Sequence, residues 1–410
     1  MQGFRKRWMA RFAARPIPGA RLIMAALLLP SMAWAQNAAS DQTLLAMSEA
    51  YRRGQSGELT RLLPSARGHV LEPLARYWEM RVRLDSAPAP EIRAALDAMA
   101  GTYWEDRLRN DWLLQLGKAR DWARFEAERP LFRMNDDRQV TCYTVMLDAA
   151  GSRLPPEVAA ERVRELWLAQ RDADDGCATA AQAFVDRGHL GTEWVWRRAR
   201  LAMESGRTRV ASQAVALIEP DAAPTVETIA ANPARYLDEK ITALRPRTKE
   251  LVTLAIIKLA DANPEAAAQE LDRTRWKAQL TQEERSWLWG VIGKRAAQKL
   301  QDNALVYFAN GQDRFMHSDH LAWKVRAGLR AGAWGHVRDA IGAMSEAQRQ
   351  QPAWVYWRAR AILALREPDA IVATAQAREL LGSIASVRGF HEQLALEALG
   401  RSVVVPPPPA

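Results

Sequence analysis

Residues 251–260 read Leu-Val-Thr-Leu-Ala-Ile-Ile-Lys-Leu-Ala, and this stretch indicates the fold of the chain. Its residues are apolar nearly all round a helix, which is typical of a helix packed on more than one side. Asn263-Pro264-Glu265 follows and predicts the end of one helix and the start of another. Asn caps the new helix, Pro takes its first position, and Glu lies near the positive end of its dipole.

Similar signals continue on either side of this stretch. Thr281 and Glu284 form a capping-box pattern ahead of the apolar run 287–289, and the double proline at 155–156 opens a further helix. The dipeptides Asn310-Gly311 and Asp175-Gly176 lack flanking strands that alternate, so they indicate turns between helices. The sequence therefore predicts an all-α chain.

A weak repeat accompanies these helices. Trp323 and Trp357 are 34 residues apart, the period of a tetratricopeptide-like helix pair, and the residues after Trp196 follow a similar pattern. We predict a superhelical array of helix hairpins, an α-solenoid. Several separate helical bundles are the alternative, but no Gly/Ser-rich linker occurs between residues 40 and 400 to separate them.

The first 35 residues have the pattern of a secretory signal peptide. Six Arg and Lys precede or flank the short apolar run 22–29, and Ala33-Trp34-Ala35 is a small-x-small cleavage site. We predict cleavage near Ala35, a mature chain from Gln36 and location in the periplasm. The alternative is an uncleaved anchor, although the apolar run is shorter than the ~20 residues of a spanning helix. No other segment is apolar for long enough to span, so no stable membrane span is expected after cleavage.

Charge and composition argue against nucleic acid as a partner. The whole chain carries 57 Lys and Arg against 48 Asp and Glu, but six of the basic residues lie in the signal, which leaves a net charge of +3. A mature chain this close to neutral lacks the basic surface of a nucleic-acid binder.

Cys142 and Cys177 are the only cysteines of the chain. An even cysteine count in an exported protein indicates a disulfide. We predict that these two residues form one, tying two helix pairs together.

Few residues point to other chemistry. Fourteen of the 16 tryptophans follow the signal, and at helical spacing most are expected in the core, although pairs such as Trp194/Trp196 and Trp287/Trp289 could leave one ring exposed to a glycan. The two histidines of the segment 317–320 have a spacing that could hold a metal, but no third ligand is evident, and solvated histidines are the simpler interpretation. The sequence contains no nucleophile-elbow, P-loop or dinucleotide-binding motif. We therefore assign no catalytic, metal or cofactor-binding residue and expect no cofactor.

From about Leu71 to Gly400 the chain resembles the soluble lytic murein transglycosylases of Gram-negative bacteria. The resemblance rests on short motifs in a fixed order. These are Pro73-Leu74-Ala75-Arg76-Tyr77-Trp78, Asp121-Trp122, Cys142-Tyr143, Glu165-Leu166-Trp167, Cys177, Arg200-Leu201-Ala202-Met203, Trp354-Val355-Tyr356-Trp357 and Arg388-Gly389-Phe390-His391.

The resemblance implies three parts: a ring of helices that encircles or guides the glycan strand, a helical linker domain, and a lysozyme-like catalytic domain. In this family a single Glu cleaves the β-1,4 bond between N-acetylmuramic acid and N-acetylglucosamine without water and leaves a 1,6-anhydro sugar. That Glu lies in a Gln-Glu-Ser-x-(Phe/Tyr) motif, which this sequence lacks. Glu204-Ser205 is followed by Gly206-Arg207, so we interpret this dipeptide as a coincidence.

We therefore expect a signal peptide at 1–35, a ring-type helical domain at 36–400 and the start of a Pro-rich linker at 401–410. The expected partners are a peptidoglycan glycan strand and a catalytic domain or another cell-wall protein. The alternative hypothesis is a periplasmic tetratricopeptide-like scaffold that binds proteins. A truncated gene of a full enzyme is a third reading of the same residues.

Overall fold

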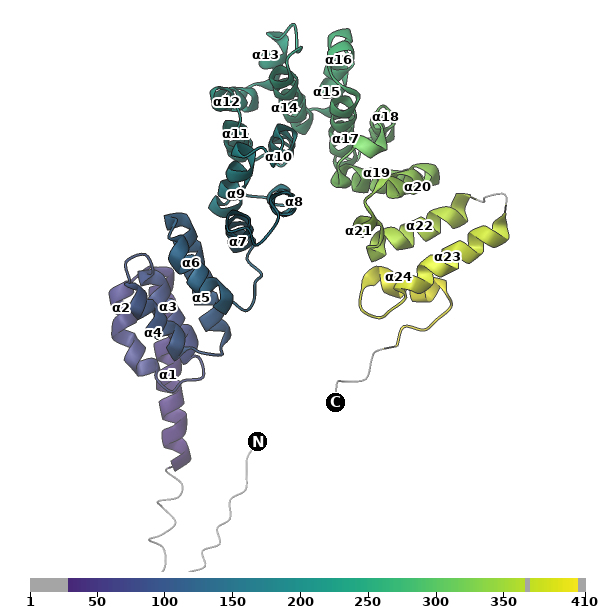
Figure 1. The fold of residues 1–410 in the computed structure, drawn as a ribbon. Helices are drawn as coiled ribbons and strands as arrows, with labels where there is room; N and C mark the ends of the chain where they lie inside the picture. Colours follow the sequence, from purple (N-terminus) through teal and green to yellow (C-terminus); the bar gives the residue numbers. More distant parts are fainter. Residues whose placement is uncertain (1–28, 366–368, 405–410) are drawn as a thin grey trace, which may run out of the picture. The chain divides into compact units, whose positions relative to one another are not determined.

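The computed structural model describes residues 29–365 and 369–404, with side chains described from Asp41 onwards. All regular secondary structure in these ranges is helical (Figure 1). The predicted all-α array of helix hairpins is thereby confirmed. The signal-peptide prediction falls largely outside the described residues. The predicted cleavage site at residues 33–35 lies within the first helix, α1 (Leu29–Arg52), and cleavage stays a prediction. The prolines at 406–409 also lie outside them.

The chain divides into two compact units, Met1–Thr144 and Val145–Ala410, and each is described by itself. The first unit contains α1 and a series of shorter helices. They are α2 (Ser56–Leu62), η1 (Leu63–Ala66), α3 (Glu72–Arg83), α4 (Ala89–Ala98), α5 (Tyr103–Ala119), α6 (Trp122–Glu128) and η2 (Arg129–Leu131). Helix α7 (Arg138–Ala150) begins in this unit and runs across the boundary.

In the first unit, α1, α2, η1 and α3 surround an apolar cluster that includes Met47, Leu59 and Ala75. Helix α5 then packs on α3, α4 and α6. A buried hydrogen bond from the Tyr77 hydroxyl to Asp111 Oδ2, 2.8 Å long, fastens α3 to α5. Apolar packing and a satisfied polar pair thus hold this unit together.

The second unit contains the remaining helices. They are α8 (Pro156–Leu168), α9 (Asp175–Asp186), α10 (Thr192–Glu204), α11 (Thr208–Ala216), η3 (Pro220–Ala222), α12 (Ala223–Ala231), α13 (Pro233–Asp238), α14 (Pro246–Ala262), α15 (Pro264–Leu271), α16 (Thr274–Gln279), α17 (Gln282–Gln298), α18 (Ala304–Ala309), η4 (Asp313–Phe315), α19 (Ser318–Ala331), α20 (Trp334–Ala343), α21 (Glu346–Arg349), α22 (Pro352–Leu365), α23 (Ala370–Ile384) and α24 (Phe390–Ala398).

Helices of the second unit pair with their neighbours in sequence and stack on the next pair. The pairs α8–α9, α10–α11, α14–α15, α17–α18, α19–α20 and α22–α23 are in contact, and α10, α14, α17 and α19 pack successively on one another. Most of the packing is therefore between neighbouring hairpins, as in a repeat protein. Trp323 and Trp357 both occupy the sixth position of the first helix of a pair, α19 and α22.

The stretch that predicts the fold lies on α14, where residues 251–257 are all buried. The predicted caps are present at both following helices. Asn263 Oδ1 accepts the Ala266 N–H at 3.1 Å, and Thr281 with Glu284 forms a full capping box at the start of α17. Local signals in the sequence therefore set these helix boundaries.

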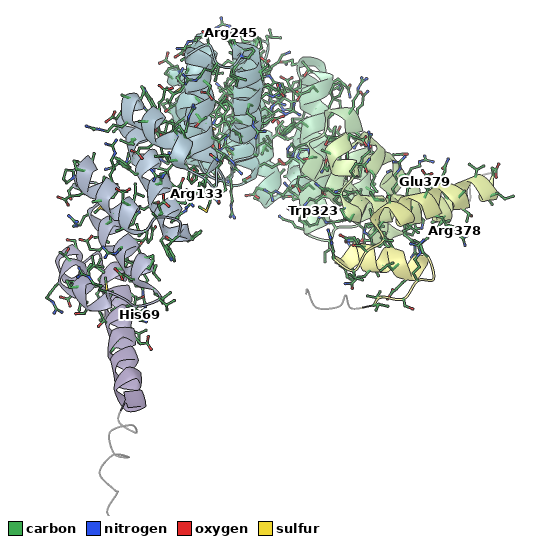
Figure 2. All side chains as sticks on the ribbon, turned by 60° about the horizontal axis from the view of Figure 1, so that its bottom comes forward. His69, Arg133, Arg245, Trp323, Arg378 and Glu379 are labelled. Carbon is green, nitrogen blue, oxygen red and sulfur yellow. The ribbon has the colours of Figure 1, made fainter. Side chains whose placement is uncertain are left out.

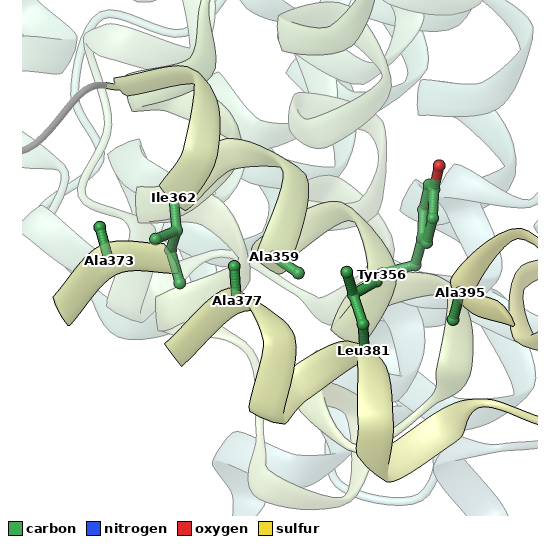
Figure 3. Packing of buried hydrophobic residues seen from close by; sticks show 7 residues of the cluster. All are labelled: Tyr356, Ala359, Ile362, Ala373, Ala377, Leu381 and Ala395. Carbon is green, nitrogen blue, oxygen red and sulfur yellow. The ribbon is translucent and has the colours of Figure 1, made fainter. Parts of the chain in front are cut away.

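Alanines bring the last helices close together. Figure 3 shows Ala359 of α22, Ala373 and Ala377 of α23 and Ala395 of α24 with the larger side chains of Tyr356, Ile362 and Leu381. Trp357 packs against this cluster, and Trp78 packs against the cluster of the first unit, while Trp112, Trp167 and Trp287 are buried. None of the described helices is both long and apolar enough to cross a membrane.

Candidate functional site

The predicted disulfide is present. Cys142 on α7 and Cys177 in the first turn of α9 are both fully buried and disulfide-bonded. Asp174 caps α9 by accepting the Cys177 N–H at 2.8 Å. The disulfide is structural, because neither sulfur is accessible to solvent.

Side chains from α10, α17 and α19 form a buried ionic cluster in the second unit. His320 Nε2 lies 2.6 Å from Glu204 Oε1, and Lys294 Nζ lies 3.5 Å from that oxygen and 2.6 Å from Asp319 Oδ2. The backbone N–H of His317 donates to His320 Nδ1, which leaves His320 Nε2 to donate to Glu204. Gly290 on α17 makes room for the ring, because a Cβ there would lie 2.5 Å from His320 Nδ1.

Glu204 is the acid of the Glu-Ser dipeptide, and its surroundings keep it ionised. Burial alone would raise the pKa of Glu204, but the neighbouring His320 and Lys294 outweigh burial and lower the pKa to about 2. A general acid in glycoside cleavage needs a raised pKa. Glu204 therefore has the properties of a structural ion-pair partner.

The interpretation of the two histidines as solvated is wrong. His320 is fully buried, and His317 is largely covered as the N-cap of α19. Burial, and then the neighbouring His320, lower the pKa of His317 to about 4, so its ring is neutral near pH 7. Across the described residues, no group of three or more His, Cys, Asp or Glu side chains is arranged to hold a metal ion.

A second ionic cluster joins α10, α14 and α17. Arg200, which is only 4% exposed, donates to Glu250 Oε1 at 2.7 Å and to Glu283 Oε1 at 2.9 Å. Burial raises the pKa of Glu250, and the hydrogen-bonded Arg200 opposes that rise. The Arg200 guanidinium also lies 5.5 Å from the ring centre of the buried Trp287. These contacts fix the side of α10 that faces the core.

Beside this part of α10, arginine and tryptophan side chains from α8, α10 and α17 stack on one another. The Arg164 guanidinium of α8 lies 4.0 Å from the Trp194 ring centre. Arg197 lies between two rings, 5.5 Å from Trp194 and 5.0 Å from Trp287. Arg197 makes no hydrogen bond or ion pair within the described part of the chain, and burial lowers its pKa. We call Arg164, Trp194, Arg197 and Trp287 the arginine–tryptophan stack.

A pocket of about 500 Å³ lies farther along the same helix, towards the end of α10. Trp194, Arg197, Leu201 and Ser205 follow one another at helical spacing along α10, and the last two line the pocket. The end of α8 and the start of α19 supply the other walls, which include Gln170 and His317. Gln170 is 5% exposed, and its Oε1 has no hydrogen-bond partner. We call this face of α10, with the stack and the pocket, the α10 face.

The α10 face is suited to binding rather than to bond cleavage. The half-exposed indole of Trp194 beside guanidinium groups offers an apolar surface for a ring and donors for oxygen atoms. The unpaired oxygen of Gln170 can accept from an N–H or O–H of a ligand. The ionic clusters behind this face hold it rigid, because their carboxylates and bases are already paired.

The tryptophan-pair prediction holds at one position and fails at the other. Trp194 is half-exposed and Trp196 is buried, as expected for a pair two residues apart. Trp287 and Trp289 are both buried, since α17 packs on α14, α15, α18 and α19. Helical periodicity did not identify Arg197 and Gln170 as candidate binding residues. The only sequence signal for this face is the run of arginines that follows Trp194.

The fold and this face define an all-α helix-hairpin repeat protein with an arginine- and tryptophan-rich surface. The chain is similar over most of its length to proteins named soluble lytic murein transglycosylase. It is 20% identical over 366 residues to the soluble lytic murein transglycosylase of Escherichia coli, which covers 86% of this chain and 54% of that protein. The protein of the same name from Salmonella typhimurium is 21% identical over 366 residues, with the same coverage. The chain therefore spans about half the length of these relatives.

One solved structure supports the fold. The structure of an inactive mutant of the lytic transglycosylase Slt from Pseudomonas aeruginosa matches with a TM-score of 0.51 at 21% identity, over 88% of this chain and 58% of that one. The 70-kDa soluble lytic transglycosylase of Escherichia coli gives a TM-score of 0.47 at 18% identity, over 89% and 58%. No family model matches the chain.

Proposed function

We propose that residues 36–400 form a ring-type helical domain that engages the glycan strands of peptidoglycan in the periplasm. In this proposal the domain supports the non-hydrolytic cleavage of the MurNAc–GlcNAc bond to a 1,6-anhydro product. In the same proposal the cleavage itself is carried out by a separate catalytic domain, because the Gln-Glu-Ser-x-(Phe/Tyr) motif does not occur in this sequence. The single observation that carries the proposal is the α10 face, where Trp194 and the unpaired Arg197 lie beside a pocket.

Two features support a glycan as the ligand. The Trp194 ring is half-exposed and backed by Arg164, so it offers a flat surface on which a sugar ring can stack. Arg197 and Gln170 add a donor and an acceptor near the same surface, which sugar hydroxyl and acetamido groups require. The sequence relatives that are named murein transglycosylases agree with this ligand.

A binding assay with purified sacculi tests the proposal. The wild-type chain should sediment with sacculi, and soluble glycan fragments should compete. Trp194→Ala should weaken binding by about 2–10-fold, because one stacking contact contributes ~0.5–1.5 kcal/mol. Trp334→Ala is the matched control, since Trp334 is also half-exposed but lies at the start of α20, outside the α10 face.

Three outcomes would contradict parts of the proposal. Sacculus binding that glycan fragments do not compete would favour the alternative of a protein-binding scaffold. Equal binding by the Trp194→Ala and Trp334→Ala proteins would remove the α10 face from the proposal. Release of anhydro-muropeptides by the chain alone would refute the statement that cleavage needs a further domain.

Export to the periplasm is part of the same proposal. The relatives are murein enzymes by name, which fits a location at the cell wall. Mass spectrometry of the protein from a periplasmic extract should find Gln36 at the amino terminus.

A further inference from the structure

A second pocket lies between α17 and α19, apart from the α10 face. Its volume is about 470 Å³, and its walls come from the end of α17, the following turn, the start of α18 and one face of α19. Trp323, Arg326, Ala327 and Arg330 line it at helical spacing along α19. Several walls are alanines, whose small side chains leave the hollow open. We call it the α17–α19 pocket; Trp323 is labelled in Figure 2.

Arg326 has an oriented guanidinium with no anionic partner. It lies 4.9 Å from the ring centre of Trp323 and 5.6 Å from that of Trp354. Within residues 29–365 and 369–404 it makes no hydrogen bond or ion pair with the protein. Stacking on two rings restricts this side chain, which lowers the entropic cost of binding an anion. A planar guanidinium held in this way suits a carboxylate.

Arg330 extends the positive charge along the wall of the pocket. Its Nη1 donates to the Leu300 carbonyl oxygen at 2.5 Å, which fixes the side chain. Its Nη2 lies 3.4 Å from Asp302 Oδ1, and Asp302 is fully exposed, so this ion pair is long and well solvated. Arg330 therefore keeps donors for a ligand.

Gln301 adds a hydrogen-bond acceptor to the pocket, next to the donors of the two arginines. Its Oε1 is buried and has no hydrogen-bond partner. A buried amide oxygen is costly to leave unpaired, and a ligand N–H would satisfy it. The pocket thus offers an acceptor for an amide N–H, apolar alanine walls and a guanidinium for a carboxylate. These groups match a short peptide with small apolar side chains and a free carboxylate.

We propose that the α17–α19 pocket binds the carboxylate-bearing peptide carried by the muramyl sugar of the glycan, with Arg326 pairing the carboxylate. This inference rests on the proposed function, since it assumes that the ligand is peptidoglycan. It assigns peptide recognition to a site separate from the α10 face. The domain then distinguishes strands that carry peptides from strands whose peptides have been removed.

Titration of three soluble probes into the full chain tests the inference. They are a GlcNAc–MurNAc disaccharide with its peptide, the same disaccharide with the peptide removed, and the free peptide. The peptide-bearing disaccharide should bind tightest. Arg326→Ala should weaken its binding by at least about tenfold, because a charge-assisted hydrogen bond is lost, while Arg326→Lys should retain part of the affinity.

Arg209→Ala is the matched control, because Arg209 is exposed on α11 of the same unit and lines neither pocket. Circular dichroism of each variant checks that the helices are intact. Equal affinity of the Arg326→Ala and Arg209→Ala proteins for the peptide-bearing probe would overturn the inference. So would equal binding of the disaccharide without peptide, which keeps only the lactyl carboxylate.

The outcome separates this inference from the proposed function. If wild-type chain binds sacculi but Arg326→Ala changes nothing, only the peptide site fails. If wild-type chain does not bind sacculi at all, the proposed function fails.

Discussion

His317 is buried at the start of α19 by the same contacts that fix the ionic cluster. The charged and titratable groups around it are His320, Glu204, Asp319 and Arg197. Its pKa is about 4 in the folded chain, against an ordinary value of 6.5. The unfolded chain therefore takes up a proton near pH 6.5, whereas the folded chain resists it until about pH 4. Acid in this window favours the unfolded state.

We predict that His317→Asn makes stability less sensitive to pH between 6.5 and 4. The wild-type chain should lose about 3 kcal/mol of unfolding free energy across this window through His317. Asn can still cap α19 but does not titrate. Urea unfolding at several pH values, followed by tryptophan fluorescence, measures the change.

His189→Asn provides the control, because His189 is exposed near the end of α9. The His189→Asn chain should show the same slope of unfolding free energy against pH as the wild-type chain. Every variant should also lose stability below pH 4.5 through Glu204. The pKa of Glu204 is lowered to about 2 in the folded chain, so its ionised form stabilises the fold above pH 4.5 and this contribution is lost as the pH falls towards 2. Identical slopes for wild-type chain and His317→Asn between pH 6.5 and 4 would show that this ring is not kept neutral by burial.

At the scale of helices, the sequence predicts what local chemistry determines. Asn263 and Thr281 set the starts of α15 and α17 through bonds that span only a few residues. The contact of Glu204 with His320 joins residues 116 positions apart, and no local signal specifies it. The all-α fold could therefore be predicted, whereas the two ionic clusters and both pockets depend on how distant helices pack.

The disulfide is the one long-range link that composition alone predicts, because the chain has only two cysteines. Cys142 lies within α7 and Cys177 at the start of α9, so the bond closes the loop 142–177 that contains α8. Closing a loop of this length reduces the entropy of the unfolded chain and stabilises the fold by about 3–4 kcal/mol.

We predict that the Cys142→Ser/Cys177→Ser double variant loses about that stability and that dithiothreitol no longer affects it. The wild-type chain should lose a similar amount on reduction. Urea unfolding with and without dithiothreitol measures both values. Unchanged stability of the double variant would mean that the bond does not restrict the unfolded chain.

At the scale of the whole molecule, the chain consists of two compact units, each with an apolar cluster of its own. Both the α10 face and the α17–α19 pocket lie in the second unit. Units with separate cores can open separately, so a defect in one need not weaken the other. The two proposed ligand contacts should then respond together to changes in the second unit.

A capping defect in the full chain tests this independence. Thr281→Ala removes the side-chain cap of α17 and should cost about 1 kcal/mol. Hydrogen exchange followed by mass spectrometry should show faster exchange in peptides from α14, α17 and α19, which pack together, and no change in peptides from α1 to α5. Thr228→Ala on the exposed side of α12 is the control and should leave both sets unchanged, because its hydroxyl bonds only to the Pro224 carbonyl four residues back. Faster exchange in both sets after Thr281→Ala would show that the two units unfold as one.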